Sequence, residues 1–257
     1  MNEGQTSDNW TIPGSEMTPS LYEEAAFRAA AGNEFRPGGL RLTEELARRC
    51  RLEPGLRVLD LACGVGSTAR FLARRWGVHV VGLDASASFI DEAAAYQDGD
   101  TDPGRGRIDW VVGRADDIPH PDGYFDAVFS ECFLSTLEDP VRVLREVRRV
   151  LRPSGLLAVT DVYLREAIAV PLPGARPAAA CLRNATDRRT MERRLDEAGF
   201  EVTTWEDHSR ALGGLVASLI FEYGSADAFW QAAVGHEPAV RESVAASRPG
   251  YCLLIAQ

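Results

Sequence analysis

A short apolar run that leads into two glycines constrains the fold of this chain more than any other feature. Residues 57–61 are predicted to form a buried strand, and Gly64 and Gly66 follow it where a helix is expected to begin. Glycine suits such a turn because, without a side chain, the backbone can turn sharply and approach a ligand closely. A buried strand followed by a glycine turn and a helix is typical of the first unit of a nucleotide-binding α/β fold.

Four further apolar runs predict parallel strands of the same sheet. They are residues 78–83, 108–113, 125–130 and 156–163. None alternates cleanly between apolar and polar residues, which is typical of strands buried on both faces of a parallel sheet. Helical segments fall between them, most clearly at 140–151, where Asp139 is the expected N-cap. We therefore predict a doubly wound, mostly parallel, seven-stranded α/β sheet of Rossmann-like type with its ligand at the carboxyl ends of the strands.

The two ends of the chain are predicted to extend this core. Helices are expected over residues 18–29 and 43–50, and a final strand is expected over 251–256. That strand follows a reversal of the chain, so it predicts an antiparallel strand at the sheet edge. The predicted units are an N-terminal helical lid (1–50), a cofactor-binding core (51–165) and a C-terminal half with substrate-pocket insertions (166–257).

The charge balance disfavours nucleic acids and anionic membranes as partners. Acidic residues outnumber basic ones 38 to 28, and the resulting net charge of -10 would repel phosphate groups. No window approaches the ~20 apolar residues of a membrane span. The five cysteines include no C-x-x-C pair, so neither a disulfide framework nor a metal site is expected. We predict a cytoplasmic protein that acts on a small molecule, and the sequence leaves the oligomeric state open.

The glycine turn by itself is compatible with two kinds of cofactor. Gly64, Gly66 and Ala69 satisfy the dinucleotide fingerprint, in which alanine can replace the third glycine, and Asp84 follows at a suitable distance. An NAD-dependent oxidoreductase is therefore one interpretation. The acid Asp60 ahead of the turn argues against it, and no Tyr-x-x-x-Lys pair is present.

Asp60, Cys63, Gly64 and Gly66 together resemble the first motif of the class I S-adenosylmethionine-dependent methyltransferases, in which an acid, two variable residues and a small residue or cysteine precede Gly-x-Gly. The resemblance implies that Asp60 organises the methionine end of the cofactor. It also implies that the turn, with Ala62 and Cys63, lies against the sulfonium and the ribose.

Two later segments also resemble this family. Asp84, followed by Ala85, falls where an acid would accept hydrogen bonds from both ribose hydroxyls. The alternative is that Asp84 caps the next helix. Ala115 and Asp116 fall where the family contacts the adenine amino group, although Arg114 occupies the position at which many members have an acid. The end of the fourth strand then adds Ser130 to the predicted cofactor site.

Other residues are predicted to form the acceptor pocket or to act as a base. The pocket candidates are Tyr22, Arg36, Glu131, Cys132 and Cys181. Methyl transfer is an in-line displacement that mainly needs alignment and exclusion of water. A general base matters only for a protonated acceptor, and its candidates are Asp207 and His208, at the end of a strand expected from Phe200 to about Trp205. No metal site is predicted.

Two narrower interpretations remain. Cys63 and Cys181 have counterparts in the arsenite methyltransferases, which bind trivalent arsenic through thiolates, although a further late cysteine of that set has no counterpart here. Whether Cys63, Cys132 and Cys181 form one thiol set is therefore an open question. The chain could also bind the cofactor without catalysis, because methyltransferases need no universal catalytic residue.

Overall fold

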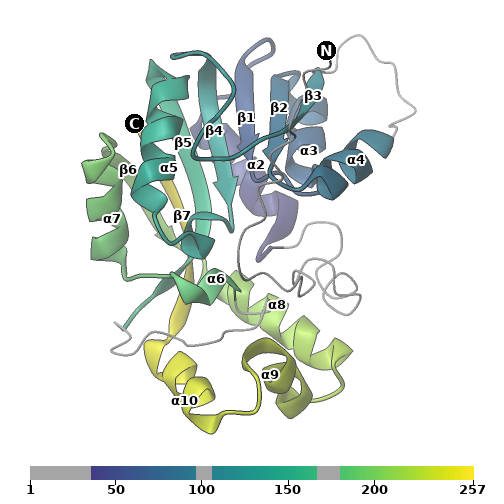
Figure 1. The fold of residues 1–257 in the computed structure, drawn as a ribbon, viewed down its shortest axis with the longest axis vertical. Coiled ribbons are helices and arrows are strands. Elements are labelled where there is room, and N and C mark those ends of the chain that lie inside the picture. The colour runs from purple at the N-terminus through teal and green to yellow at the C-terminus, as the bar shows by residue number, and fades with distance from the viewer. Residues whose placement is uncertain (1–35, 97–105, 167–179) are drawn as a thin grey trace, which may run out of the picture.

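Seven strands form one sheet in the order β3-β2-β1-β4-β5-β7-β6 (Figure 1). The structure is a computed structural model that describes residues 36–96, 106–166 and 180–257. The strands are β1 (Arg57–Leu61), β2 (His79–Asp84), β3 (Ile108–Val112), β4 (Phe125–Glu131), β5 (Leu151–Leu164), β6 (Val202–Asp207) and β7 (Pro249–Ala256). β7 pairs antiparallel with both β5 and β6, and the other pairs are parallel. The predicted fold class is confirmed, with β7 lying one position inside the edge strand β6.

Helices cover both faces of the sheet. They are α2 (Gly39–Arg49), α3 (Ser67–Trp76), α4 (Ala87–Ala95), η3 (Leu134–Thr136), α5 (Pro140–Val150), α6 (Ala180–Arg183), α7 (Arg188–Glu197), α8 (Ser209–Glu222), α9 (Ala226–Val234) and α10 (Pro238–Ser247). Apolar residues of α5 and α7 belong to one buried cluster, and those of α2 and α3 belong to another. The two clusters lie on opposite faces of the sheet, which explains why its central strands have apolar residues on both faces.

The start of helix α5 is determined by signals in the local sequence. The Asp139 side chain accepts a hydrogen bond from the Arg142 N–H at 3.2 Å, and Pro140 occupies the first turn. Both features favour a helix start, because proline lacks the N–H that a first turn leaves unpaired. Val143 and Val147 then lie on the buried face. The helix predicted over 140–151 is therefore found almost unchanged.

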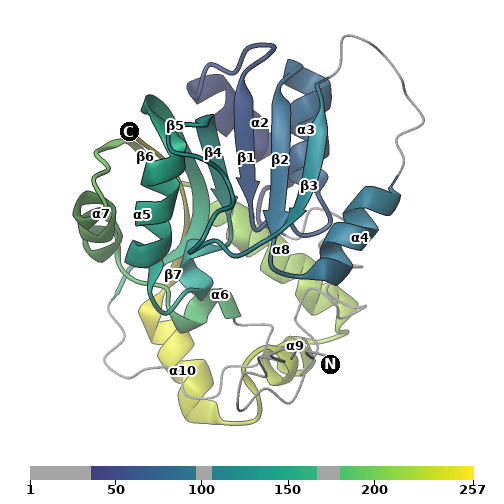
Figure 2. The ribbon, with the colours of Figure 1, turned by 45° about the horizontal axis from the view of Figure 1, so that its top comes forward.

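A helical layer that the sequence did not predict lies between β6 and β7. Residues 209–247 form α8, α9 and α10, which enclose an apolar cluster of their own around Leu219, Phe229 and Val244. Figures 1 and 2 show this layer beyond the carboxyl ends of β1, β2 and β4. No described helix is long and apolar enough to cross a membrane. The helix predicted over 18–29 lies outside the described residues.

The indole ring of Trp110 on β3 covers two glycines near the first turn. Gly82 of β2 is its partner in register, and a Cβ at Gly82 would lie 2.5 Å from the Trp110 ring. Gly66 has a left-handed φ of 80°, and a Cβ there would lie 2.1 Å from the same ring. The absence of side chains at these positions therefore allows the ring to pack against the glycine turn after β1.

We expect Gly82→Ala to lower the free energy of unfolding by about 1–3 kcal/mol, because the added methyl group overpacks this contact. Urea denaturation measures the change. The additional replacement Trp110→Leu should recover part of the loss. The matched control is Gly214→Ala within α8, where a Cβ meets no atom within 4 Å, so stability should rise slightly. Equal effects at Gly82 and Gly214 would contradict the prediction.

Candidate functional site

A cavity of about 240 Å³ opens at the carboxyl ends of β1 and β4. Its walls come from the turn after β1, the last residue of β2, the end of β4 and the first turns of α3 and α4. The lining residues are Arg36, Asp60, Ala62, Cys63, Gly64, Val65, Ser67, Thr68, Asp84, Phe89, Glu131, Cys132, Phe133 and Thr136. The cavity therefore lies at the sheet edge where a doubly wound fold binds its ligand.

Asp84 holds the glycine turn in place. Its Oδ2 accepts a hydrogen bond from the Gly64 N–H and its Oδ1 accepts one from the Ser86 N–H, both at 2.9 Å. Ser86 is the N-cap of α4, and its hydroxyl accepts from the Phe89 N–H at 3.3 Å. The alternative role of Asp84 as the helix cap is therefore wrong. Each carboxylate oxygen keeps a further lone pair for a ligand.

Asp60 is the most deeply buried acid of the cavity. It is 3% exposed, and its Oδ2 has no hydrogen-bond partner among the described residues. Burial and the nearby charge of Glu131 raise its pKa to about 7, although Arg36 opposes the shift. An unpaired buried carboxylate oxygen is costly, so it is rare unless a ligand supplies the missing partner. A bound donor or cation would supply the partner that this oxygen lacks.

Glu131 joins three elements at the rim of the same cavity. Its Oε1 lies 3.1 Å from Arg36 Nε and accepts a hydrogen bond from the Thr43 hydroxyl at 3.0 Å, and its Oε2 accepts one from the Thr68 hydroxyl at 2.6 Å. The Arg36 and Glu131 side chains are only 8% and 4% exposed. Arg36 also donates to the Thr43 hydroxyl at 2.6 Å. The end of β4 is thereby fixed to α2 and α3.

The backbone is strained where β1 and β4 end. Ala62 and Cys132 follow these strands with φ values of 59° and 55°, which side chains other than glycine rarely adopt. Such conformations persist where the surrounding structure enforces them, often at ligand sites. Here the Cys132 thiol is paired with the hydroxyl of the buried Tyr251 at 3.1 Å, and that hydroxyl donates to Thr160 Oγ1 at 2.9 Å.

The structure brings eight of the predicted site residues together around the cavity. Those that line the cavity are Asp60, Ala62, Cys63, Gly64, Asp84, Arg36, Glu131 and Cys132. Those outside its lining are Gly66, Ala85, Ala115, Asp116, Ser130 and Cys181, and Tyr22 lies outside the described residues. Sequence reasoning missed Val65, Ser67, Thr68, Phe89, Phe133 and Thr136. Thr68 could have been inferred, because the first turn of α3 follows the glycines directly.

Asp116 is paired with arginines rather than directed at the cavity. Its two oxygens form hydrogen bonds with Arg114 at 2.8 and 2.9 Å, and Arg142 lies 3.2 Å away. The hydrogen bond from Arg114 lowers the pKa of Asp116. Arg114, which departs from the family pattern, thus engages the acid that was expected to replace the missing one. The predicted contact of Asp116 with adenine has no geometric support.

Asp207 and His208 lie at a different part of the sheet edge and do not line the cavity. Burial alone would raise the pKa of Asp207, but hydrogen bonds from Ser209 and Arg165 lower it far below its usual range. Such a carboxylate is a weak base. These residues are therefore misplaced for proton removal in the cavity, because β7 inserts between β5 and β6 and moves β6 outward.

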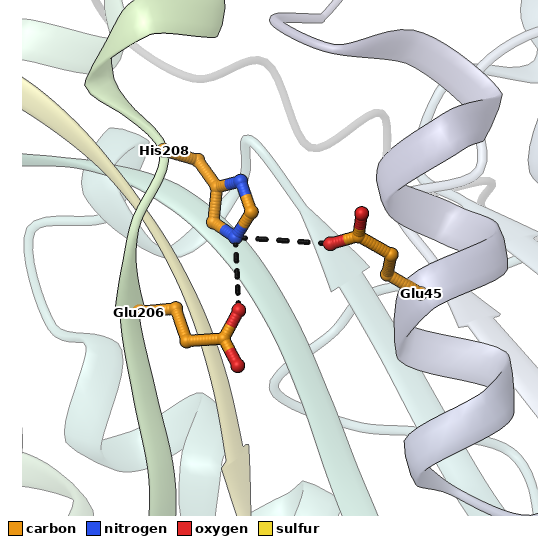
Figure 3. A group of neighbouring side chains, drawn as sticks. All are labelled: Glu45, Glu206 and His208. Carbon is orange, nitrogen blue, oxygen red and sulfur yellow. Dashed lines mark hydrogen bonds and ion pairs between the residues drawn. The ribbon is translucent and has the colours of Figure 1, made fainter.

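His208 forms one candidate cation group with Glu45 and Glu206 (Figure 3). Its Nε2 lies 3.1 Å from Glu206 Oε2 and 3.8 Å from Glu45 Oε2. Both carboxylates already have cationic partners, however. Arg49 lies 2.6 Å from Glu206, and Arg41 lies 3.0 Å from Glu45. The group is therefore an ion-pair network that joins α2 to β6.

The cysteines do not form a thiol site within the described part of the chain. Cys63, Cys132 and Cys181 do not gather into a group of three ligands there. Burial raises the pKa of the Cys181 thiol to about 12, and it raises the pKa of Cys132 well above its usual value. Such thiols stay protonated at neutral pH, whereas the thiolate is the metal ligand. Binding of a metalloid by this set is not supported.

Comparison with known proteins identifies relatives of the chain. A family model described as "Methyltransferase domain" matches residues 59–159. The ubiquinone/menaquinone biosynthesis C-methyltransferase of Vibrio cholerae is 30% identical over 77% of this chain and 84% of its own length. The methyltransferase GfsG of Streptomyces halstedii is 35% identical over 49% of this chain. The chain spans about half or less of several such relatives, with 45%, 37% and 54% of their lengths matched.

Two solved structures also resemble this chain. The cyclase SpnF is 31% identical, with a TM-score of 0.66, and the match covers 84% of this chain and 80% of SpnF. An arsenic(III) S-adenosylmethionine methyltransferase from Chlamydomonas reinhardtii is 23% identical, with a TM-score of 0.57, and the match covers 79% of this chain and 63% of that one. The second likeness shows a shared fold alone.

Proposed function

Because this chain belongs to the class I S-adenosylmethionine-dependent methyltransferases, we propose that it transfers a methyl group from S-adenosylmethionine to a small-molecule acceptor at the cavity beside Asp60. The observation that supports this most strongly is the partnerless buried oxygen of Asp60. It lies next to a glycine turn braced by Asp84. A cationic ligand with hydrogen-bond donors would satisfy both carboxylates.

The charges of the cavity fit this cofactor. S-adenosylmethionine has a sulfonium, an ammonium, a carboxylate and two ribose hydroxyls. Three acids line the cavity, Asp60, Asp84 and Glu131, and Arg36 is the guanidinium beside them. We assign Asp60 to the cationic methionine end and Asp84 to the ribose. Arg36, whose planar guanidinium suits a carboxylate, is assigned to the cofactor carboxylate.

The cofactor supplies a methyl group already activated by positive sulfur, so this chain contributes binding, orientation and exclusion of water. Phe89 and Phe133 form an apolar part of the cavity wall. Among the described residues, no histidine lines the cavity. An acceptor that reacts without an enzymatic base, or through a carbon or an already deprotonated atom, is therefore favoured. The helical layer α8–α10 beyond the strand ends is the proposed wall of the acceptor pocket.

Calorimetric titration of the full chain tests the cofactor assignment. S-adenosylhomocysteine is expected to bind with a stoichiometry of one, and NADH is expected to give no heat of binding. The reverse result would overturn the assignment in favour of a dinucleotide site. Incubation with methyl-labelled S-adenosylmethionine and a panel of phenols, quinols, amines and thiols then tests transfer. Label in an extracted product supports the proposed activity.

A second candidate is a protein that binds the cofactor without consuming it. It is favoured by the similarity to SpnF, which is named as a cyclase. In that case S-adenosylhomocysteine would bind, whereas no acceptor in the panel would gain label. The two steps of the experiment thus separate a methyltransferase from a binder that uses the same fold.

A further inference from the structure

A second hollow lies near the end of β6, at the same edge of the sheet as the cofactor cavity. It measures about 460 Å³ and is lined by Arg41, Arg165, Asp207, His208, Ser209, Arg210 and Ala211. These residues come from the first turn of α2, the position after β5, the end of β6 and the first turn of α8. The hollow shares no lining residue with the cofactor cavity. It is therefore a separate concave site.

The walls of this hollow are basic, although the chain as a whole is acidic. Three arginines and a single carboxylate, Asp207, line it, whereas the net charge of the chain is -10. Within the described part of the chain, the Arg210 side chain makes no ion pair or hydrogen bond. A local excess of positive charge in an acidic protein attracts small anions, which leads them to this surface.

The arginines differ in how firmly they are held. Arg165 donates from Nη2 to Asp207 Oδ2 at 2.8 Å, and Asp207 also accepts from the Ser209 N–H at 2.8 Å. This contact and a side-chain hydrogen bond with Tyr163 orient Arg165, whose remaining N–H groups can donate to further partners. Arg41 pairs with Glu45 one helical turn away, but its side chain is 61% exposed. Such surface pairs contribute about 0.5 kcal/mol, so an anion can compete for Arg41.

The start of α8 adds to the positive potential of the hollow. The helix has 14 residues, and its N-cap, His208, forms no side-chain cap. Helix N-termini favour anions through their unpaired N–H groups and the helix dipole. Asp207 already accepts a hydrogen bond from one of these N–H groups, that of Ser209. The three guanidinium groups are therefore the principal attraction, and the helix end reinforces it.

We propose that this hollow binds the phosphate group of a small molecule, at a site distinct from the cofactor cavity. Guanidinium groups form paired hydrogen bonds with phosphate oxygens, and three arginines from three elements line this hollow. The site goes beyond methyl transfer, because it requires neither the cofactor nor an acceptor. It provides a place for a phosphorylated ligand or for free phosphate.

Titration calorimetry of the full chain with pyrophosphate at low ionic strength tests the proposal. Pyrophosphate is expected to bind, and Arg210→Ala should weaken the binding about fivefold, which is the loss of one charged contact of about 1 kcal/mol. The matched control is Arg145→Ala, which removes an exposed arginine of α5 far from the hollow. The control should bind as the unchanged protein does. Absence of binding, or equal affinities of the two variants, would overturn the proposal.

Two further titrations identify the ligand chemistry and the place of binding. Malonate should bind more weakly than pyrophosphate, and a malonate affinity equal to or above that of pyrophosphate would refute a phosphate site. Saturating S-adenosylhomocysteine should leave the pyrophosphate affinity unchanged. Loss of pyrophosphate binding under that condition would place the anion in the cofactor cavity and contradict a second site. Inorganic phosphate in place of pyrophosphate shows whether a single free phosphate suffices.

Discussion

Asp60→Asn is expected to weaken S-adenosylmethionine binding about 100-fold while stabilising the protein without its cofactor. The loss follows because an amide cannot neutralise a cationic ligand, and charged hydrogen bonds contribute up to about 3 kcal/mol. The gain follows because the carboxylate is buried with one oxygen unpaired. Removing its charge should add on the order of 2 kcal/mol to the free energy of unfolding at pH 8. Calorimetry and urea denaturation measure the two effects.

The same residue predicts how pH affects both properties. Burial and Glu131 raise the pKa of Asp60 to about 7 in the folded protein, whereas an unfolded aspartate has a pKa near 3.9. The folded state therefore binds the proton more tightly, so its stability falls as pH rises from about 4 to 7. The affinity for the cationic cofactor should rise over the upper part of this range, because binding requires the ionised carboxylate.

Comparison of variants separates the contribution of Asp60 to the pH dependence from that of other titrating groups. Burial also raises the pKa of Asp161 to about 6, so the relevant quantity is the difference between the unchanged protein and Asp60→Asn. The affinity of the variant should be nearly independent of pH between 6 and 8. Asp196→Asn, at an exposed position of α7, is the matched control and should change neither property. Unchanged affinity in Asp60→Asn would remove Asp60 from the site.

Glu131→Ala is expected to lower the free energy of unfolding by about 3–5 kcal/mol. The substitution leaves Arg36 buried without its carboxylate, and it removes the acceptor of the Thr43 and Thr68 hydroxyls. Breaking a buried ion pair costs this much because one charge remains uncompensated. Urea denaturation measures the loss, and the exposed Glu138→Ala is the matched control, with an expected change below about 0.5 kcal/mol.

A second variant keeps this prediction testable if Glu131→Ala does not fold. Glu131→Gln retains one of the two oxygens that accept from the threonine hydroxyls but removes the charge opposite Arg36. It should therefore be less destabilising than alanine, and combination with Arg36→Met should recover stability because neither member of the buried pair is then charged. If Glu131→Gln and Glu138→Ala had the same small effect, the buried pair would not be an important link between α2 and β4.

Much of the core could be predicted because its signals are local. The strand at 57–61 and the helix α5 follow from an apolar run and from Asp139 with Pro140, all within a few residues. Local signals also misled at one point. The apolar run at 156–163 predicted only the second part of β5, which begins at Leu151, where it pairs with Phe125 of β4.

The site residues that a motif determines lie together in the structure, whereas the surroundings of Asp116 and His208 depend on contacts that no motif specifies. The turn after β1 and Asp84 are close in space because parallel β1 and β2 end together. By contrast, the partner of Asp116 is Arg114, and no spacing rule predicts that a neighbouring arginine will neutralise it. The position of His208 depends on β7 pairing on both its sides, which the local sequence does not specify.

The place of β7 in the sheet also affects the order in which the molecule can form. β7 follows the helical layer α8–α10 in the chain, yet it lies between β5 and β6, and Leu157 pairs with Ala256 across a large part of the sequence. Such distant pairings are slow to form, because the chain loses the entropy of closing a long loop before any stabilising contact is made. Until then, one edge of β5 is unpaired and β6 has no partner strand. A folding intermediate with these edges open is prone to self-association, so dilution should favour productive refolding over aggregation.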